Sequence, residues 1–163
     1  MKAITLWQPW ASFMFANLPY PPKTIETRTQ QRRHRGPLAI HAGKREPAWV
    51  RRMFSEDRDL SDLMLEYLGV TDVGDLPHGC VLGVVKMVSC VPTDSIRDEL
   101  SRTERLLGDY DTDRAAIITA DPSRLVSPVP WRGRQGWWNL PDDALDGREF
   151  VLADGVARWG GGR

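Results

Sequence analysis

Residues 79–91 read GCVLGVVKMVSCV, the longest apolar run in the chain. The run is rich in valine, a β-branched residue that favours strands over helices. Gly83 lies inside the run, and a glycine within a strand is typical of a bend or a close approach by another backbone. The run therefore predicts a long, bent strand in a β-barrel.

Shorter segments on both sides of this run supply the remaining elements. Period-two alternation and strand-forming residues predict strands over residues 3–6, 23–28, 37–41, 115–120 and 148–152. Helical spacing predicts helices over residues 10–17, from about Pro47, over residues 61–68 and over residues 93–107. Pro122, Pro128 and Pro130 predict a loop after residue 120. Strands interleaved with a few helices, without regular βαβ alternation, favour an α+β barrel.

Length and composition favour one domain in the cytoplasm. The chain has 163 residues, 41% hydrophobic and 27% charged, which argues against a membrane protein or a fibre. No run reaches the ~18–20 apolar residues of a membrane span, and the N-terminal residues do not have the pattern of a signal peptide. We expect a single domain over residues 1–155 and a flexible, glycine-rich tail over residues 156–163.

The cysteines and histidines favour neither a disulfide framework nor a metal site. Cys80 and Cys90 are the two cysteines, and on one extended strand they lie too far apart to bridge. The three histidines are scattered, so their spacing does not suit zinc or iron. We therefore expect no metal and no cofactor.

The net charge is zero, but the charges are unevenly placed along the chain. Residues 23–52 hold nine Lys or Arg against two Glu, and residues 55–75 hold seven Asp or Glu against one Arg. A local basic surface is what a nucleic-acid-binding protein needs, whatever its total charge. Ordinary solvated faces explain the same two runs about equally well.

Five blocks of sequence, taken in order along the chain, form a pattern that can be compared with known domains. They are KAITLWQPWAS, KTIETR, RGPLAIHAGK, HGCVLGVVKMVSCV and PWRGRQGWWNL. Together they resemble ASCH domains over residues 2 to about 140. The family pattern Gly-x-Lys-x-x-Glu-x-Arg keeps its charged residues here as Lys23, Glu26 and Arg28, whereas Pro21 replaces the glycine. The resemblance implies an α+β fold, a PUA-like mixed or antiparallel β-barrel flanked by several short helices.

The resemblance also implies association with nucleic acid, usually RNA, or with a modified nucleoside or nucleotide, through a cationic cleft beside the barrel. An alternative is a hydrolase acting on a nucleoside or on RNA, with Lys23 and Glu26 as catalytic residues. Some similar proteins are amidohydrolases that remove the acetyl group of acetylcytidine, and their catalytic lysine aligns with Lys23. Their catalytic threonine aligns with Glu26, so half of that match fails. At least one member is described as a ribonuclease. A domain that only contacts other proteins is the third alternative.

The residues around KTIETR can form such a cleft. On a strand Glu26 and Arg28 share one face, and Lys23 joins them if the chain bends near Pro22. Trp7 can stack on a base and Gln8 can hydrogen-bond its edge. Further candidates for ligand contacts are Arg35, His41, Arg132, Arg134 and Gln135. The structural alternatives are a surface ion pair, tryptophans that fill the core, a satisfied core histidine and exposed turns.

Overall fold

The computed structural model describes residues 1–16, 21–152 and 155–158. The described strands are β1 (Lys2–Leu6), β2 (Ile25–Arg28), β3 (Gly36–Ala42), β4 (Cys80–Pro92), β5 (Ala115–Pro130), β6 (Trp137–Asn139), β7 (Glu149–Leu152) and β8 (Gly155–Arg158). The helices are α1 (Trp10–Phe13), α2 (Ala48–Glu56), α3 (Arg58–Leu68) and α4 (Arg102–Leu107), with short 3-10 turns at Val73–Asp75, Thr93–Ser95 and Arg97–Glu99.

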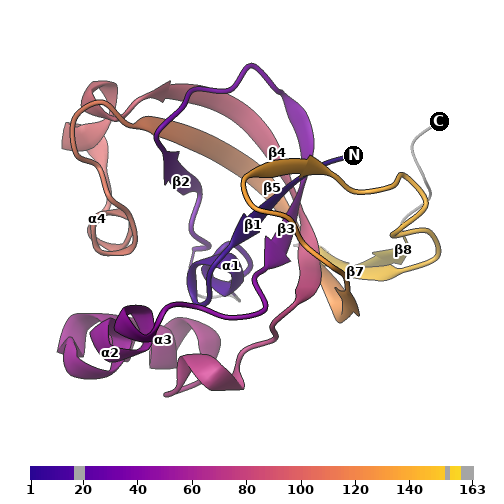
Figure 1. The fold of residues 1–163 in the computed structure, drawn as a ribbon, viewed down its shortest axis with the longest axis horizontal. Coiled ribbons are helices and arrows are strands. Elements are labelled where there is room, and N and C mark those ends of the chain that lie inside the picture. The colour runs from indigo at the N-terminus through magenta and orange to yellow at the C-terminus, as the bar shows by residue number, and fades with distance from the viewer. Residues whose placement is uncertain (17–20, 153–154, 159–163) are drawn as a thin grey trace.

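The strands form one curled mixed sheet, as Figure 1 shows, in the order β6-β1-β3-β4-β5-β7-β8, while β2 also pairs with β5. The pairing of β1 with β3 is parallel, and the other pairings are antiparallel. Helices α2 and α3 lie together at one end of the sheet, and α4 lies beside β2 (Figure 1). The predicted α+β barrel flanked by short helices is confirmed.

The predicted long strand, residues 79–91, corresponds to β4, which pairs with β3 on one edge and β5 on the other. Its ladder with β5 shifts register three times, and each shift is a bulge or irregularity that bends the pair. Gly83 lies at one of these shifts. A Cβ at Gly83 would meet Ser123 O at 2.3 Å and the Phe15 ring at 2.8 Å, so the strand needs glycine there.

The loop predicted after residue 120 is wrong. The proline-containing segment continues β5 to Pro130. Pro122 lies where β5 gains a residue between Ala120 and Ser123, next to Asp121, whose φ is +51°. Pro128 lies in the next register shift, and Pro130 ends the strand. A proline has no N–H to donate, and bulges and strand ends are the places where a sheet tolerates that loss.

The predicted helix over residues 93–107 is confirmed only at its end. Only Arg102–Leu107 is α-helical, and it follows two 3-10 turns. Leu100 is extended, and Ser101 then begins α4 by accepting a hydrogen bond from the backbone N–H of Glu104 at 3.1 Å.

The other predicted elements keep their type and change their bounds. The expected strands at residues 3–6, 37–41 and 148–152 and the helix near Pro47 are present. Helix α3 begins before residue 61 because the Asp57 carboxylate accepts a hydrogen bond from Leu60 N–H at 3.1 Å. Helix α1 ends at Phe13, and residue 17 of the expected helix lies outside the described residues.

The buried side chains of the described residues form three clusters. The largest lies inside the curled sheet around residues such as Leu38, Val85 and Ile117, and a second packs Trp138 and Phe150 against the outer side. The third holds α1, α2 and α3 together through Phe13 and Phe54. In the described part of the chain, no helix has the length and apolar character to cross a membrane.

The expected domain boundary stays a prediction. The backbone of Gly155–Arg158 pairs with β7 as β8, although residues 156–158 were assigned to the flexible tail. The remainder of that tail lies outside the described residues.

Replacing Gly83 with alanine tests the close approach of β4 and β5. Because the new Cβ would press on backbone and on a core ring, we expect Gly83→Ala to lose about 1–3 kcal/mol of unfolding free energy. Urea denaturation measures this loss. Val88→Thr, at an exposed position of the same strand, should stay within about 0.5 kcal/mol of the parent chain. Equal midpoints for the two variants would contradict the close approach.

Candidate functional site

Lys23 lies just before β2, in a segment held by backbone hydrogen bonds. The Lys23 N–H donates to Phe13 O at 2.8 Å, and Thr24 O accepts from both Thr119 N–H at 2.8 Å and Thr119 Oγ1 at 2.9 Å. These bonds displace Lys23 from the regular strand, which begins at Ile25 and not at residue 23. Lys23 therefore precedes the regular strand, and its side chain lies on the same side as that of Glu26.

The Lys23 ammonium is buried between two carboxylates. Its Nζ is 3.6 Å from Glu104 Oε2 and 4.0 Å from Glu26 Oε2, and the side chain is only 1% exposed. Among the described residues no group is placed to hydrogen-bond this Nζ. A buried ammonium needs both opposite charge and hydrogen bonds, and here only the charge is supplied.

Glu104 reaches this site from α4 and is itself held in place. Its Oε1 accepts from Thr24 N–H at 2.6 Å and from Thr24 Oγ1 at 3.0 Å. Tyr110 donates its hydroxyl to Glu104 Oε2 at 3.2 Å. Burial, and then the charge of Glu104, raises the pKa of Tyr110, so this hydroxyl stays a donor.

Arg28 connects the charged cluster to β1. Its Nε is 3.1 Å from Glu26 Oε1, and its Nη2 donates to Thr5 O at 3.1 Å. The Thr5 side chain in turn donates to Arg134 O at 2.8 Å and accepts from Trp138 Nε1 at 3.1 Å. Arg28 is the more accessible cation of the cluster, because its side chain is 34% exposed.

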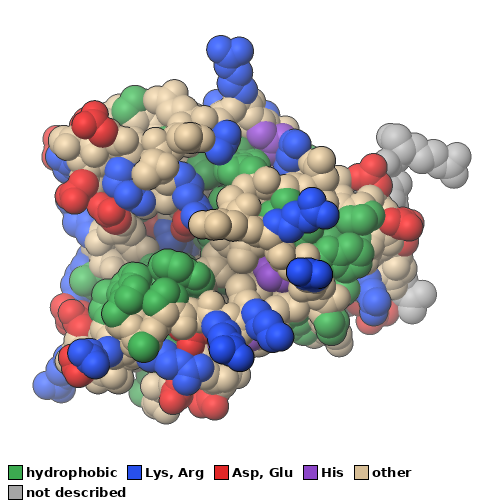
Figure 2. Space-filling model, viewed as in Figure 1, with side chains coloured by type: hydrophobic (Ala, Val, Ile, Leu, Met, Phe, Trp, Pro, Cys, Tyr) green, Lys and Arg blue, Asp and Glu red, His purple; other side chains and the backbone are tan. Residues whose placement is uncertain are grey.

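Two exposed tryptophans, Trp7 just after β1 and Trp49 on α2, form an aromatic surface. Trp7 is 45% exposed and Trp49, from α2, is 54% exposed. Their ring centroids are 5.8 Å apart in an edge-to-face contact, and Trp49 also lies 6.5 Å from Trp10. Figure 2 shows a hydrophobic patch on this face below a hollow in the surface. Acidic and basic side chains lie at the bottom of the hollow.

Gln8 and His41 were candidate ligand contacts, and the structure buries both. Gln8 donates through Nε2 to Pro77 O at 2.7 Å and accepts from Ser12 N–H at 3.1 Å, so its amide holds the start of α1. His41 Nε2 lies 3.0 Å from Trp131 O. Burial lowers the pKa of His41, and the contact with Trp131 O opposes that shift in part. Both residues therefore belong to the structural frame of the site.

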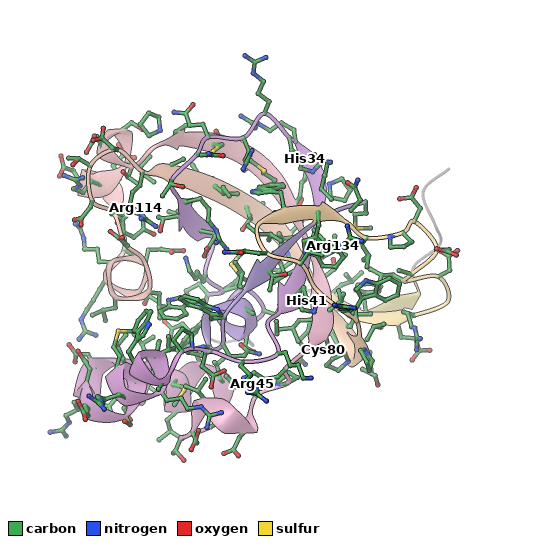
Figure 3. The ribbon with its side chains drawn as sticks, viewed as in Figure 1. His34, His41, Arg45, Cys80, Arg114 and Arg134 are labelled. Atoms are coloured by element: carbon green, nitrogen blue, oxygen red, sulfur yellow. The ribbon has the colours of Figure 1, made fainter. Side chains whose placement is uncertain are left out.

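The remaining candidates lie on exposed loops. Arg35 donates to the carbonyls of Arg32 and His34 at 3.1 and 2.7 Å, so its guanidinium is tied to its own loop. Arg132, Arg134 and Gln135 are exposed on the loop between β5 and β6. Thr5 brings the backbone of this loop close to Arg28, and Figure 3 shows Arg134 in front of the sheet. The described residues contain no group of three or more His, Cys, Asp or Glu that could hold a metal ion.

Glu104, Tyr110 and Trp49 are parts of this site that the sequence alone does not indicate. The pattern Ser101-x-x-Glu104 is that of a capping box, in which the glutamate turns back to the N-cap residue. Here the Glu104 carboxylate instead bonds Thr24, 80 positions away in the chain. No signal local to residues 101–110 indicates that contact.

Comparisons with known proteins agree with this fold. No protein-family model matches the chain. Activating signal cointegrator 1 from Homo sapiens and the protein of that name from Mus musculus are each 26% identical to it over 155 residues, which is 91% of this chain and 24% of theirs. The chain thus spans about a quarter of the length of these relatives. The crystal structure of ASCH from Zymomonas mobilis is 16% identical, covers 88% of this chain and 89% of its own, and has a TM-score of 0.50.

At 16% identity, the similarity to the Zymomonas mobilis structure shows a shared fold and nothing further. The curled mixed sheet with short flanking helices is the fold of an ASCH domain, and the resemblance that the five sequence blocks carry is confirmed to that extent.

A double-mutant cycle tests whether Lys23 and Glu104 interact. We expect Lys23→Met and Glu104→Gln each to cost about 3 kcal/mol of unfolding free energy, because each leaves a buried charge with less compensation. Their sum should exceed the cost of the double variant by about 1 kcal/mol or more. The matched control is Arg58 with Asp62, an exposed pair at 3.8 Å, whose coupling should stay below about 0.5 kcal/mol. Additive costs at Lys23 and Glu104 would contradict the pairing.

The burial of His41 predicts a pH dependence of stability. Because its pKa is lowered in the folded state, the unfolded chain binds more protons between that value and about 6.5. Stability should therefore fall as the pH drops below about 6.5 and recover above it. We expect His41→Gln, which can still donate to Trp131 O, to show a smaller loss between pH 7.5 and pH 5.5 in urea denaturation. The same loss in both chains would contradict a buried, neutral His41.

Proposed function

We propose that this domain binds RNA, or a modified nucleotide, by placing one base against Lys23, Glu26 and Arg28. The observation that carries the proposal is the buried Lys23 Nζ, which has charge partners but no hydrogen-bond partner in the described part of the chain. A base carbonyl or a phosphate oxygen is the acceptor that such a group lacks. Glu26 and Arg28, with side chains 16% and 34% exposed, are the part of the cluster that solvent reaches.

The balance of charge supports a base, and not a phosphate, as the group closest to Lys23. Lys23 and Arg28 are matched by Glu26 and Glu104, so the centre of the cluster has no excess positive charge. A base offers both carbonyl acceptors and amine donors, and such a ligand suits cations and carboxylates placed side by side. The cationic part of the cleft then comes from the surrounding loops, among them the one with Arg132 and Arg134.

The hydrolase is the second candidate. It is favoured by the 4.0 Å separation of Lys23 Nζ from Glu26 Oε2, which places an amine and a carboxylate where both could act on one bond. This arrangement would use Lys23 and Glu26 as catalytic residues on a nucleoside or on RNA.

Binding is tested with a fluorescently labelled single-stranded RNA of ten nucleotides, measured by anisotropy from 50 to 300 mM salt. We expect an affinity that falls with salt by about 0.7 log units per log unit of salt for each phosphate contact. Arg28→Gln should weaken binding by about tenfold, because it removes a charged donor. The matched control is Arg58→Gln, an exposed arginine on α3 that should bind as the parent chain does. No binding at 50 mM salt, or equal loss in both variants, would remove the proposal.

Turnover separates the two candidate functions. The hydrolase predicts product from acetylcytidine or from single-stranded RNA, and no product from a folded Lys23→Ala chain. Absence of product with both substrates would leave binding alone, while product formed equally by the Lys23→Ala chain would exclude Lys23 as the catalytic residue.

A further inference from the structure

A pocket separate from the Lys23 cluster lies at the loop between β3 and α2. It has a volume of about 470 Å³ and is lined by Lys44, Arg45, Glu46, Ala48, Arg51 and His78. Three of these side chains are permanent cations and one is a carboxylate. Leaving His78 aside, the lining therefore has a formal charge of +2, from three positive charges less one negative charge.

The single carboxylate of this pocket is already used by the protein. Glu46 accepts hydrogen bonds from Arg51 Nε and, at 2.7 Å, from His78 Nε2, and its side chain is only 1% exposed. Burial opposes its ionised form, but the bonds from Arg51 and His78 outweigh burial and lower the pKa of Glu46. Lys44 and Arg45 are exposed, and neither has an ion-pair partner among the residues that the structure describes. They are the charges left for a ligand.

The backbone that presents these cations is fixed at several points. His78 Nδ1 bonds Leu76 O at 2.6 Å, while its other nitrogen contacts Glu46. The Gly79 N–H donates to Ala42 O at 3.0 Å and to Gly43 O at 3.2 Å. The loop that carries Lys44 and Arg45 is thus tied to the start of β4, so the backbone that presents these two cations at the pocket is fixed before any ligand arrives.

The pocket adjoins the exposed tryptophans. A Cβ built on Gly43 would lie 3.6 Å from Trp7 Cδ1, and Trp49 follows Ala48 of the pocket lining directly. Figure 2 shows lysine and arginine side chains next to the hydrophobic patch on this face, and Figure 3 places Arg45 in the same region. An aromatic surface beside fixed cations is the arrangement with which proteins bind single strands, since bases stack and phosphates pair.

We infer that the Lys44–Arg45 pocket binds a backbone phosphate of the same strand whose base lies at Lys23, with Trp7 and Trp49 stacking bases between them. This inference rests on the proposed function and deepens it. The ligand is then a single-stranded polynucleotide, because a free nucleoside has no phosphate to reach the second pocket. Strand β1 connects the two sites, because Arg28 bonds Thr5 O and the next residue, Leu6, accepts at 2.8 Å from the N–H of Gly43, which precedes Lys44.

The test compares the Lys44→Ala/Arg45→Ala chain with an Arg52→Ala/Arg58→Ala chain. Both remove two positive charges, and the control arginines lie on outer helix faces with side chains 74% and 93% exposed. The probes are the ten-nucleotide RNA and free cytidine, the latter followed by NMR. We expect the pocket variant to weaken RNA binding about tenfold at 150 mM salt and to reduce the salt slope by about 1.4, that is two contacts at ~0.7 each. Cytidine binding and the control should not change.

The outcomes separate this inference from the function it rests on. If Arg28→Gln weakens RNA binding while the Lys44→Ala/Arg45→Ala chain matches its control in affinity and salt slope, the second site is absent and the base site stands. If the pocket variant weakens cytidine as strongly as RNA, the phosphate role is also wrong. If the parent chain binds no RNA at 50 mM salt, the proposed function fails and this inference fails with it.

Discussion

The pairing of β4 with β5 is the constraint on which the rest of the molecule depends. These two strands share the longest ladder of the sheet, and three register shifts bend it. The other edge of β5 pairs with β2 near Ala115 and with β7 near Arg124. One bent strand therefore positions both the strand that follows Lys23 and the strands near the C-terminus. The close approach at Gly83 makes the bend possible, because a side chain there would collide with β5.

From this frame the charged cluster follows in two steps. β5 holds β2 and, through Thr119, fixes Thr24, which places Lys23 and Glu26 on the same side of the sheet. Glu104 then closes the cluster from α4 by bonding Thr24. Such an arrangement is poor as a source of stability, since burying ions costs about as much as their attraction returns. Strained or costly polar groups in an otherwise consistent fold point to function, and this cluster is the clearest case in the described chain.

The sequence predicts those parts of the fold that depend on local pattern. The valine-rich run identifies β4, and the spacing of Glu26 and Arg28 predicts that these two side chains share a face. Lys23 meets Glu26 only because the regular strand begins after it, at Ile25. The bulges that let prolines enter β5 depend on its partner strand and leave no local pattern, so Pro122 and Pro128 by themselves predict a loop. Glu104 was missed because its partner is distant in sequence. Gln8 and His41 are polar residues whose burial depends on tertiary packing, and the pattern around them does not reveal it.

The two proposed sites would give a strand one path, from the balanced charges at Lys23 across Trp7 and Trp49 to the cations at Lys44 and Arg45. The most direct test is NMR chemical-shift mapping, or a crystal structure, of the domain with a ten-nucleotide single-stranded RNA. The account predicts a base in contact with Glu26 or Arg28, and a phosphate within reach of Lys44 or Arg45. RNA bound at the β7–β8 end of the sheet, with the Lys23 cluster unperturbed, would contradict it.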